Sequence, residues 1–454
     1  MLLTMALALP MDGPPIRDAA ILVADGRIVA VGGRAEIAAL PEAHGVERRD
    51  FGDVVALPGL VNGHIHLEFT ALGPLNAPES FHPWIRGLVA WSGRQTEDDW
   101  RASTVAGARA SLASGVTCLG EILTRNYGLA TMLALGLRGT AYLEFLGGRR
   151  ATLAEELARF DGRLAAARAL LGEGGDPPGV RLGLSPHTPY SVTGPGIRAI
   201  AGRAHDAALP LAMHLAESPD EVAFLRDGTG TIADFLRTAE PDGSPRETYR
   251  AGGYGIGPVE HVAAQGLFRT AHPTLLIHGT QLTDAEIATL RDQDTAVVLC
   301  PRSNALLRCG AASVAALLAS GVTLAIGTDS LGSNEDLDLF NELRALATIA
   351  RAQGATDEAA LARRLLALAT LEGARALALD SEVGSLTPGK LADLTLLDLP
   401  AALTADPYTA ILHEGRAARV RCTLLGGRVA YEAVTNRAPI PNDAPRGSSE
   451  ERDR

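Results

Sequence analysis

Leu57-Pro-Gly-Leu-Val-Asn-Gly-His-Ile-His-Leu-Glu-Phe69 is the stretch that decides the fold and the chemistry of this chain. An apolar run over residues 54–60 predicts a strand, and after its Pro-Gly break come His64 and His66. Residues two positions apart in an extended backbone point to the same side. Both imidazoles can therefore reach one metal ion from one strand end. A single His-x-His pair is a weak motif, but polar residues recur after later strand-like runs.

Outward from this stretch, the chain alternates between strands and helices. Amphipathic helices are expected between most of the strands, for example over 152–171, 195–208, 283–293 and 311–321. Eight such units predict a closed (β/α)₈ TIM barrel. An open doubly wound sheet is the alternative, but no glycine-rich dinucleotide turn follows the first strand. The expected strands are 54–60, 116–119, 140–143, 180–184, 211–214, 274–278, 296–300 and 322–326.

The two ends of the chain have a different pattern, made of short strands and tight turns. Residues 21–31 form a predicted hairpin about Asp25-Gly26, and residues 420–431 form another about Gly426-Gly427. We therefore expect one small β-sandwich module built from residues 1–53 and 385–435, with the catalytic barrel at 54–384. The Pro-, Ser- and charge-rich residues 436–454 predict a disordered tail.

Composition limits the partners and the compartment. In 454 residues, no run approaches the roughly 20 apolar residues of a membrane span, and the apolar start lacks the basic region of a signal peptide. Four distant cysteines without Cys-x-x-Cys spacing fit a reducing cytoplasm rather than a disulfide framework. A net charge of −12 disfavours nucleic acid. We expect a cytoplasmic protein with a small-molecule substrate and no membrane or nucleic-acid partner. The sequence does not fix the oligomeric state, and a homodimer is our working hypothesis.

Polar residues follow each predicted strand of the barrel, at the end where barrel active sites are assembled. One such residue is ordinary turn chemistry. Five of eight strands that end in His or Asp, in a chain with 11 histidines, are hard to assign to capping alone. In chain order the strand-end residues are His64 and His66, Glu121, Glu144, His187, His214 with Glu217, His278, Asn304 and Asp329.

The order of these motifs resembles the amidohydrolase superfamily. The motifs are Pro-Gly-x-Val-Asn-x-His-x-His, His-x-x-Glu, His-Gly, Cys-Pro-x-Ser-Asn and Gly-Thr-Asp-Ser. Within the superfamily the chain is similar to the metal-dependent aminohydrolases of adenine nucleosides, guanine, cytosine and chlorotriazines. The resemblance implies a metal site of three histidines and one aspartate with an open position for water, as in catalytic zinc sites. The implied ligands are His64, His66, His214 and Asp329.

The same resemblance implies the groups that move protons. His278 and Asp329 would accept the proton of the attacking water, and Glu217 would protonate the ring nitrogen beside the attacked carbon. Binuclear members of the superfamily bridge two metals with a lysine on the fourth strand. Lys390 is the single lysine of this chain and lies outside the barrel, so we expect one divalent metal per chain. Zn²⁺ is the first choice and Fe²⁺ the alternative.

Substrate contacts are implied at two positions. His187, in Ser185-Pro-His-Thr-Pro-Tyr190, resembles the histidine that contacts the nucleoside in adenosine-type deaminases, and Trp84 lies where a tryptophan covers the substrate. The motifs look most similar to the aminodeoxyfutalosine deaminases of the menaquinone pathway. Deaminases of S-adenosylhomocysteine and methylthioadenosine are the alternative, followed by guanine-, cytosine- and chlorotriazine-type aminohydrolases.

Two further function classes stay open at this point. A binding protein that kept the barrel and lost its chemistry would be expected to lack ligands, yet all six implied positions are present. A hydrolase with a serine nucleophile would need a Gly-x-Ser-x-Gly elbow, which the barrel lacks. The sequence thus favours a hydrolase that acts on carbon–nitrogen bonds of amidines, an aminohydrolase.

Overall fold

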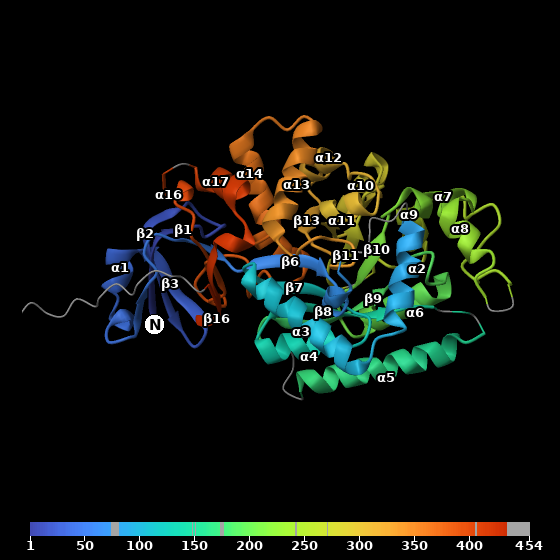
Figure 1. Cartoon of the computed structure of the whole chain (residues 1–454), viewed down its shortest axis with the longest axis horizontal. Coiled ribbons are helices and arrows are strands. Elements are labelled where there is room, and N and C mark those ends of the chain that lie inside the picture. Colours follow the sequence, from blue (N-terminus) through green and yellow to red (C-terminus); the bar gives the residue numbers. More distant parts are fainter. Residues whose placement is uncertain are drawn as a thin grey trace, which may run out of the picture.

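A computed structural model describes residues 1–73, 81–147, 149, 151–172, 177–240, 243–269, 271–404 and 406–433. The tail predicted at 436–454 lies outside these residues. Figure 1 shows a sheet module at one end of the molecule, where the two ends of the described chain meet, and a larger α/β body beside it. Among the described helices, none combines the length and the apolar character needed to cross a membrane.

The module is one sheet of eight strands taken from both ends of the sequence. Its order is β16-β15-β14-β5-β1-β2-β3, with β4 paired to β1. The predicted hairpin turns are confirmed, because Asp25, Gly26, Gly426 and Gly427 all have positive φ, as a type I′ turn requires. The strands are β1 (Leu2–Ala8), β2 (Ile16–Ala24), β3 (Arg27–Gly33), β4 (Arg48–Asp50), β5 (Val55–Pro58), β14 (Leu394–Leu397), β15 (Val420–Leu425) and β16 (Arg428–Glu432).

The apolar run before the histidines belongs to two sheets, and the prediction of one barrel strand over 54–60 is wrong. β5 pairs with β1 and β14 in the module, whereas β6 (Leu60–Ile65) is the first barrel strand. The chain passes between the two sheets at Gly59, where an added Cβ would lie 2.0 Å from Thr117 Oγ1. Only glycine fits this crossing. The sheet of the module thus includes residues 55–58, which the prediction had assigned to the barrel.

Eight parallel strands form the barrel, as two four-stranded sheets joined at their edges. At one seam the Leu184 amide donates to the Pro210 carbonyl at 2.9 Å, and at the other the Asp329 amide donates to the His64 carbonyl at 3.1 Å. The predicted (β/α)₈ class is confirmed. The first sheet holds β6, β7 (Val116–Leu123), β8 (Arg138–Phe145) and β9 (Val180–Pro186); the second holds β10 (Ala212–Leu215), β11 (Thr274–His278), β12 (Thr295–Leu299) and β13 (Thr323–Ile326).

Helices surround the barrel strands (Figure 1). The longer ones are α2 (Phe81–Ser92), α3 (Glu97–Ala113), α4 (Tyr127–Leu135), α5 (Leu153–Leu171), α6 (Gly194–Asp206), α7 (Pro219–Asp227), α10 (Asp284–Arg291), α13 (Leu339–Ala352), α14 (Glu358–Leu368) and α17 (Pro407–Glu414). The shorter helices of the chain are α1 (Arg34–Ala38), which packs on β2 and β3 of the module, α8 (Gly230–Leu236), α9 (Pro258–Ala264), α11 (Pro301–Leu306), α12 (Val314–Ser320), α15 (Leu371–Ala376), α16 (Ala401–Thr404) and the 3₁₀ turns η1 (Pro41–Ala43), η2 (Leu67–Leu72) and η3 (Ala417–Arg419).

The barrel strands are buried on both faces, which explains why they appear in the sequence as continuous apolar runs. All eight residues of β7 are buried, and so are all six of β6. Apolar burial is the main source of stability for such a barrel. Polar side chains interrupt this core where the strands end, and these side chains form the site described next.

Candidate metal and catalytic site

Five predicted site residues come together at the carboxyl ends of four strands. His64 lies within β6 and His66 follows that strand, His214 is part of β10, and His278 ends β11. Asp329 lies three residues beyond the end of β13. Four of the five are buried, and the side chain of the fifth, His66, is 11% exposed. The barrel topology thus brings together residues that are up to 265 positions apart, 329 minus 64.

The spacing of their nitrogen and oxygen atoms suits one metal ion. His64 Nε2 lies 3.3 Å and His66 Nε2 lies 3.7 Å from Asp329 Oδ1. Within the sets His64/His66/His214 and His64/His278/Asp329, donor atoms lie within 4.8 Å of one another. Three imidazoles with one carboxylate form a donor set that divalent transition metals such as zinc prefer.

Unused hydrogen-bonding atoms support the same conclusion. Among the described residues, both ring nitrogens of His64 and Nδ1 of His66 are buried without a hydrogen-bond partner. Buried polar atoms are seldom left in this state in folded proteins. Burial, followed by repulsion from His64, lowers the pKa of His66 to about 3, and burial likewise lowers the pKa of His214. The His66 and His214 rings are therefore neutral near pH 7, with lone pairs free for a metal.

Asn62 and Glu121 hold the first two histidines in place. The Asn62 side chain donates to Thr328 Oγ1 at 2.7 Å and accepts the Thr328 amide at 3.1 Å, which ties β6 to the segment that carries Asp329. The buried carboxylate of Glu121 accepts the amide of Leu67, the residue after His66, at 3.0 Å. The sequence placed Glu121 at a strand end but did not predict its role.

Serine hydroxyls orient the carboxylate of Asp329. Ser303 Oγ and Ser333 Oγ both donate to Oδ2 at 2.7 Å, and the Ser330 amide donates to Oδ1 at 2.8 Å. With Oδ2 occupied in this way, Oδ1 is the oxygen that faces the histidines. Asp329 also has φ +58°, an uncommon backbone conformation that tends to occur at functional sites.

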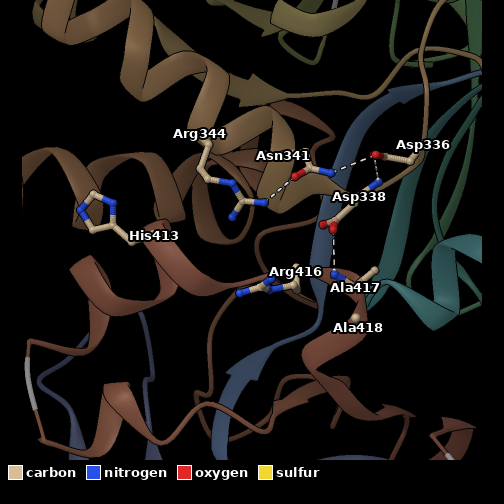
Figure 2. Close-up of a pocket in the computed structure, with 8 residues that line it drawn as sticks. All are labelled: Asp336, Asp338, Asn341, Arg344, His413, Arg416, Ala417 and Ala418. Atoms are coloured by element: carbon tan, nitrogen blue, oxygen red, sulfur yellow. Dashed lines mark hydrogen bonds between the residues drawn. The ribbon is translucent and has the colours of Figure 1, made fainter.

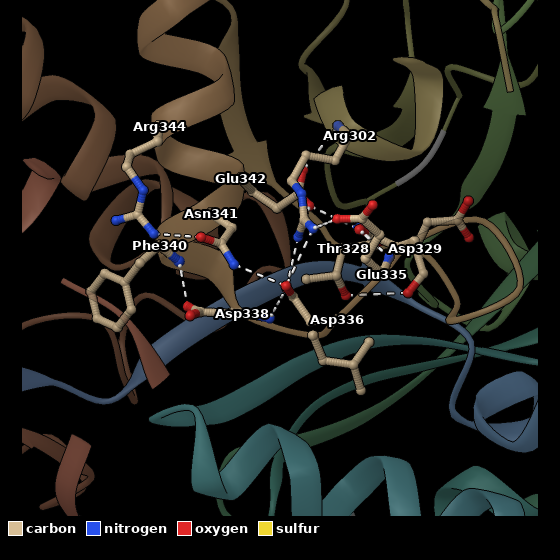
Figure 3. A network of polar contacts seen from close by, with 12 residues as sticks. Arg302, Thr328, Asp329, Glu335, Asp336, Asp338, Phe340, Asn341, Glu342 and Arg344 are labelled. Carbon is tan, nitrogen blue, oxygen red and sulfur yellow. Dashed lines mark hydrogen bonds and ion pairs between the residues drawn. The ribbon is translucent and has the colours of Figure 1, made fainter. Parts of the chain in front are cut away.

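A buried polar network supports this segment from outside (Figure 3). Glu342 accepts the Asn334 side chain at 2.7 Å and the Arg302 amide at 3.1 Å. Asn334 also donates to the Thr328 carbonyl at 2.8 Å, and the Arg302 guanidinium pairs with Asp336 at 2.6 Å. Glu342 thus holds Arg302, the residue before Ser303, directly, and it holds Thr328, the residue before Asp329, through Asn334.

Glu217 and His278, the predicted proton-handling pair, lie side by side. His278 Nε2 is 3.4 Å from Glu217 Oε1, and Asn304 contacts the other ring nitrogen, Nδ1, at 3.2 Å. Burial, then the nearby charges of Asp329 and Glu221, raise the pKa of Glu217 well above its usual range. A raised pKa favours the protonated form of the carboxyl, which is the form that a general acid needs.

The two predicted substrate contacts differ in position. His187 borders the histidine cluster: its ring centroid is 5.1 Å from that of His214, and Ser191 Oγ binds its Nδ1 at 2.7 Å. Trp84 donates its indole N–H to the Gly332 carbonyl at 2.8 Å, on the segment that follows Asp329. It also packs, half-buried, against an apolar cluster that contains Tyr190. His187 thus borders the histidine cluster directly, whereas Trp84 is linked to it through the segment that follows Asp329.

An open pocket of about 500 Å³ lies elsewhere, between the start of α13 and the chain after α17 (Figure 2). None of the proposed ligands or proton-handling residues lines it. Asp338 accepts the Ala417 amide there at 2.7 Å, and Arg344 donates to the Gly415 carbonyl. Its polar groups thus join the chain after α17 to the barrel. The lining residues are Asp336, Asp338, Asn341, Arg344, His413, Arg416, Ala417 and Ala418.

Comparison with known proteins gives consistent matches along the chain. The model of the amidohydrolase family matches residues 55–430. A 5-methylthioadenosine/S-adenosylhomocysteine deaminase from Moorella thermoacetica is 30% identical over 429 residues, which cover 92% of this chain and 91% of the relative.

Solved structures agree with this match. An adenosine deaminase from Xanthomonas campestris with bound zinc has a TM-score of 0.78 and 26% identity, over 94% of this chain and 92% of that one. Helicobacter pylori aminofutalosine deaminase in complex with methylthio-coformycin also has a TM-score of 0.78, over 94% and 99% of the two chains. Its identity of 22% makes this second likeness one of fold.

Proposed function

The chain belongs to the amidohydrolase family, as the order of its strand-end motifs predicted, and it is a hydrolase that acts on carbon–nitrogen bonds; we propose that it is a metal-dependent deaminase of an adenine-containing nucleoside. One observation carries the proposal. The three histidines and Asp329 converge with the Glu217–His278 pair beside them, 3.4 Å apart. A barrel that had lost its chemistry would have no reason to keep both the donor set and the proton-handling pair.

We assign one divalent metal to His64, His66, His214 and Asp329, with Zn²⁺ as the first choice and Fe²⁺ as the alternative. A metal held there would make a water molecule acidic enough to react near neutral pH. The absence of lysine from the barrel supports a single ion, because a lysine-bridged pair cannot form.

The residues around the metal site divide the proton transfers between them. His278 and Asp329 accept the proton of the attacking water, since both point into the cluster and His278 carries a neutral ring. Glu217 donates its proton to the ring nitrogen beside the attacked carbon, which adenine offers as N1 next to C6. Water and the aminopurine thus yield the 6-oxopurine and ammonia.

The substrate class rests on His187, Trp84 and the relatives. His187 borders the histidine cluster and Trp84 offers an aromatic face, which suits stacking on a purine. The relatives support methylthioadenosine and S-adenosylhomocysteine. The sequence motifs favour aminodeoxyfutalosine, of the menaquinone pathway. The solved aminofutalosine deaminase supports this substrate only through its similar fold. The cytoplasmic location and the homodimer remain predictions from the sequence.

A deamination screen tests this proposal. Purified protein is assayed for ammonia release from adenosine, methylthioadenosine, S-adenosylhomocysteine, aminodeoxyfutalosine, adenine, guanine and cytosine. We expect turnover of a 5′-substituted adenosine, with free adenine poorer because remote contacts help to position the reacting ring. Turnover of guanine or cytosine while every adenosine derivative stays inert would contradict the nucleoside proposal and leave the metal chemistry standing.

A further inference from the structure

Glu221 is a fully buried carboxylate in the first turn of α7, four residues after Glu217. Its Oε1 accepts the amide of Ala216 at 2.8 Å, and its Oε2 accepts the amide of Glu217 itself at 3.0 Å. Both oxygens of one carboxylate therefore hold two consecutive amides at the end of β10. This is the segment that runs from the proposed ligand His214 to the proposed acid.

This arrangement differs from ordinary helix capping. In a capping box, the third helical residue binds the amide of the N-cap residue. Glu286 does this in α10, where its carboxylate accepts the amide and hydroxyl of Thr283. Glu221 has the same place relative to its N-cap Ser218, yet it reaches past that residue to the two before it. The contacts of Glu221 thus serve the strand end rather than the helix.

The turn that Glu221 holds is an uncommon one. Ala216 has φ +52°, in the left-handed region that residues other than glycine rarely adopt. Its carbonyl accepts the Gln281 amide at 2.8 Å, so the turn is also tied to the segment after His278. With both backbone groups of Ala216 engaged, the Glu217 backbone is fixed relative to β11. The Glu217 carboxyl consequently meets the His278 ring.

We propose that Glu221 is a positioning residue for the deamination: by accepting two consecutive amides with one carboxylate, it holds Glu217 against His278. The inference rests on the proposed function, which makes Glu217 the proton donor. Only a carboxylate can accept on both oxygens, because the amide of a glutamine would turn an N–H toward one of the two backbone donors. Even Glu221→Gln, which hardly changes the shape of the side chain, should therefore impair the positioning of Glu217.

Glu221→Gln tests the proposal, with Glu286→Gln as a control at the same helix position. We expect Glu221→Gln to lower kcat about 10- to 100-fold, the scale of a misplaced catalytic group, with KM and bound metal close to wild type. Glu286→Gln should change kcat by less than about twofold, because the Glu286 side chain caps the start of α10. Equal losses in both variants would show a general effect on the fold and overturn the proposal.

A double variant separates positioning from other roles. If Glu221 acts through Glu217, then adding Glu221→Gln to Glu217→Gln should cause no further loss of kcat. Losses that multiply would mean that Glu221 acts independently of Glu217. Should Glu221→Gln fold poorly, Ala216→Gly can be added, since glycine adopts the left-handed turn without strain.

A crystal structure of metal-loaded Glu221→Gln gives a readout that needs no turnover. The proposal predicts that the Glu217 carboxyl leaves contact with His278 Nε2 while the histidine cluster keeps its geometry. A Glu217 carboxyl that stays in place would overturn the positioning role. This readout stands even if no nucleoside proves to be a substrate, so a failure of the proposed function and a failure of this inference can be told apart.

Discussion

Asp329 and His64 are joined twice, once through the backbone and once through their side chains. The Asp329 amide donates to the His64 carbonyl at 3.1 Å, and Asp329 Oδ1 lies 3.3 Å from His64 Nε2. The first bond ties β6, the first barrel strand, to the segment that follows β13, the last one. The second contact sets two proposed ligands at the same seam, so barrel closure and assembly of the metal site are one structural event.

Removal of a ligand should reduce metal binding more than it reduces the stability of the fold. Asp329→Ala and His64→Ala are each expected to lose the bound metal and to abolish turnover, because each takes one donor from a four-donor set. Loss of protein stability should be modest, since the site lies at the mouth of the barrel. Elemental analysis and thermal unfolding measure the two effects. A variant that keeps a full equivalent of metal would exclude that residue as a ligand.

Glu217→Gln separates proton donation from metal binding. The variant keeps the shape and hydrogen-bonding capacity of the side chain but has no proton to give to the ring. We expect kcat to fall roughly 10²-fold or more, the usual scale of general acid catalysis, with metal content unchanged. His278→Asn should behave in the same way. Loss of metal from Glu217→Gln, with a normal rate per metal still bound, would make Glu217 a ligand or a support residue.

Trp84 can be probed with two substitutions. Trp84→Ala should lower kcat/KM for purine nucleosides and leave metal binding intact, because it removes the aromatic face. Trp84→Phe keeps an aromatic ring but loses the indole N–H that binds the Gly332 carbonyl. Wild-type kcat/KM in the Phe variant would assign the effect to stacking. An Ala variant with unchanged kcat/KM would show that Trp84 only packs on the barrel rim.

Glu342 gives a prediction for the dependence of stability on pH. Burial raises its pKa from 4.5 to about 8, although bonds from Asn334 and Arg302 favour the charged form. Between these pH values the folded chain binds more protons than the unfolded chain, so the contribution of Glu342 to stability falls as the pH rises. Each unit of pKa difference corresponds to about 1.4 kcal/mol.

Glu342→Gln cannot ionise and therefore lacks this contribution. We expect the free energy of unfolding of the variant, relative to wild type, to increase between pH 5.5 and pH 8. Urea unfolding of both proteins at the two pH values measures this difference. A relative stability that stays constant or decreases over this range would show that Glu342 is already ionised in the folded protein.

Local sequence patterns predicted the elements but not every partner of the site. Strand periodicity and strand-end polar residues pointed to His64, His214 and Asp329, because a barrel must bring strand ends together. The split of the apolar run at Gly59 was missed, since β5 and β6 are equally apolar and differ only in the sheet that they join.

The supporting residues were missed for another reason. Asn62, Ser333 and Glu221 act through hydrogen bonds to particular backbone or side-chain atoms, and such bonds leave no periodic pattern. One signal in the sequence did point to Glu221: it lies three residues after Ser218, which is the spacing of a capping box. That signal predicts a helix start, and only the folded chain shows that both oxygens reach back to the strand.

Metal titration against turnover tests the central claim most directly. The protein is stripped with a chelator, and zinc is added back in fractions of an equivalent while ammonia release from methylthioadenosine, or from another nucleoside found active, is followed. The account predicts no activity without metal, and a rate that rises linearly and stops rising at one equivalent per chain. A break at two equivalents, or full turnover by the stripped protein, would contradict a single-metal deaminase.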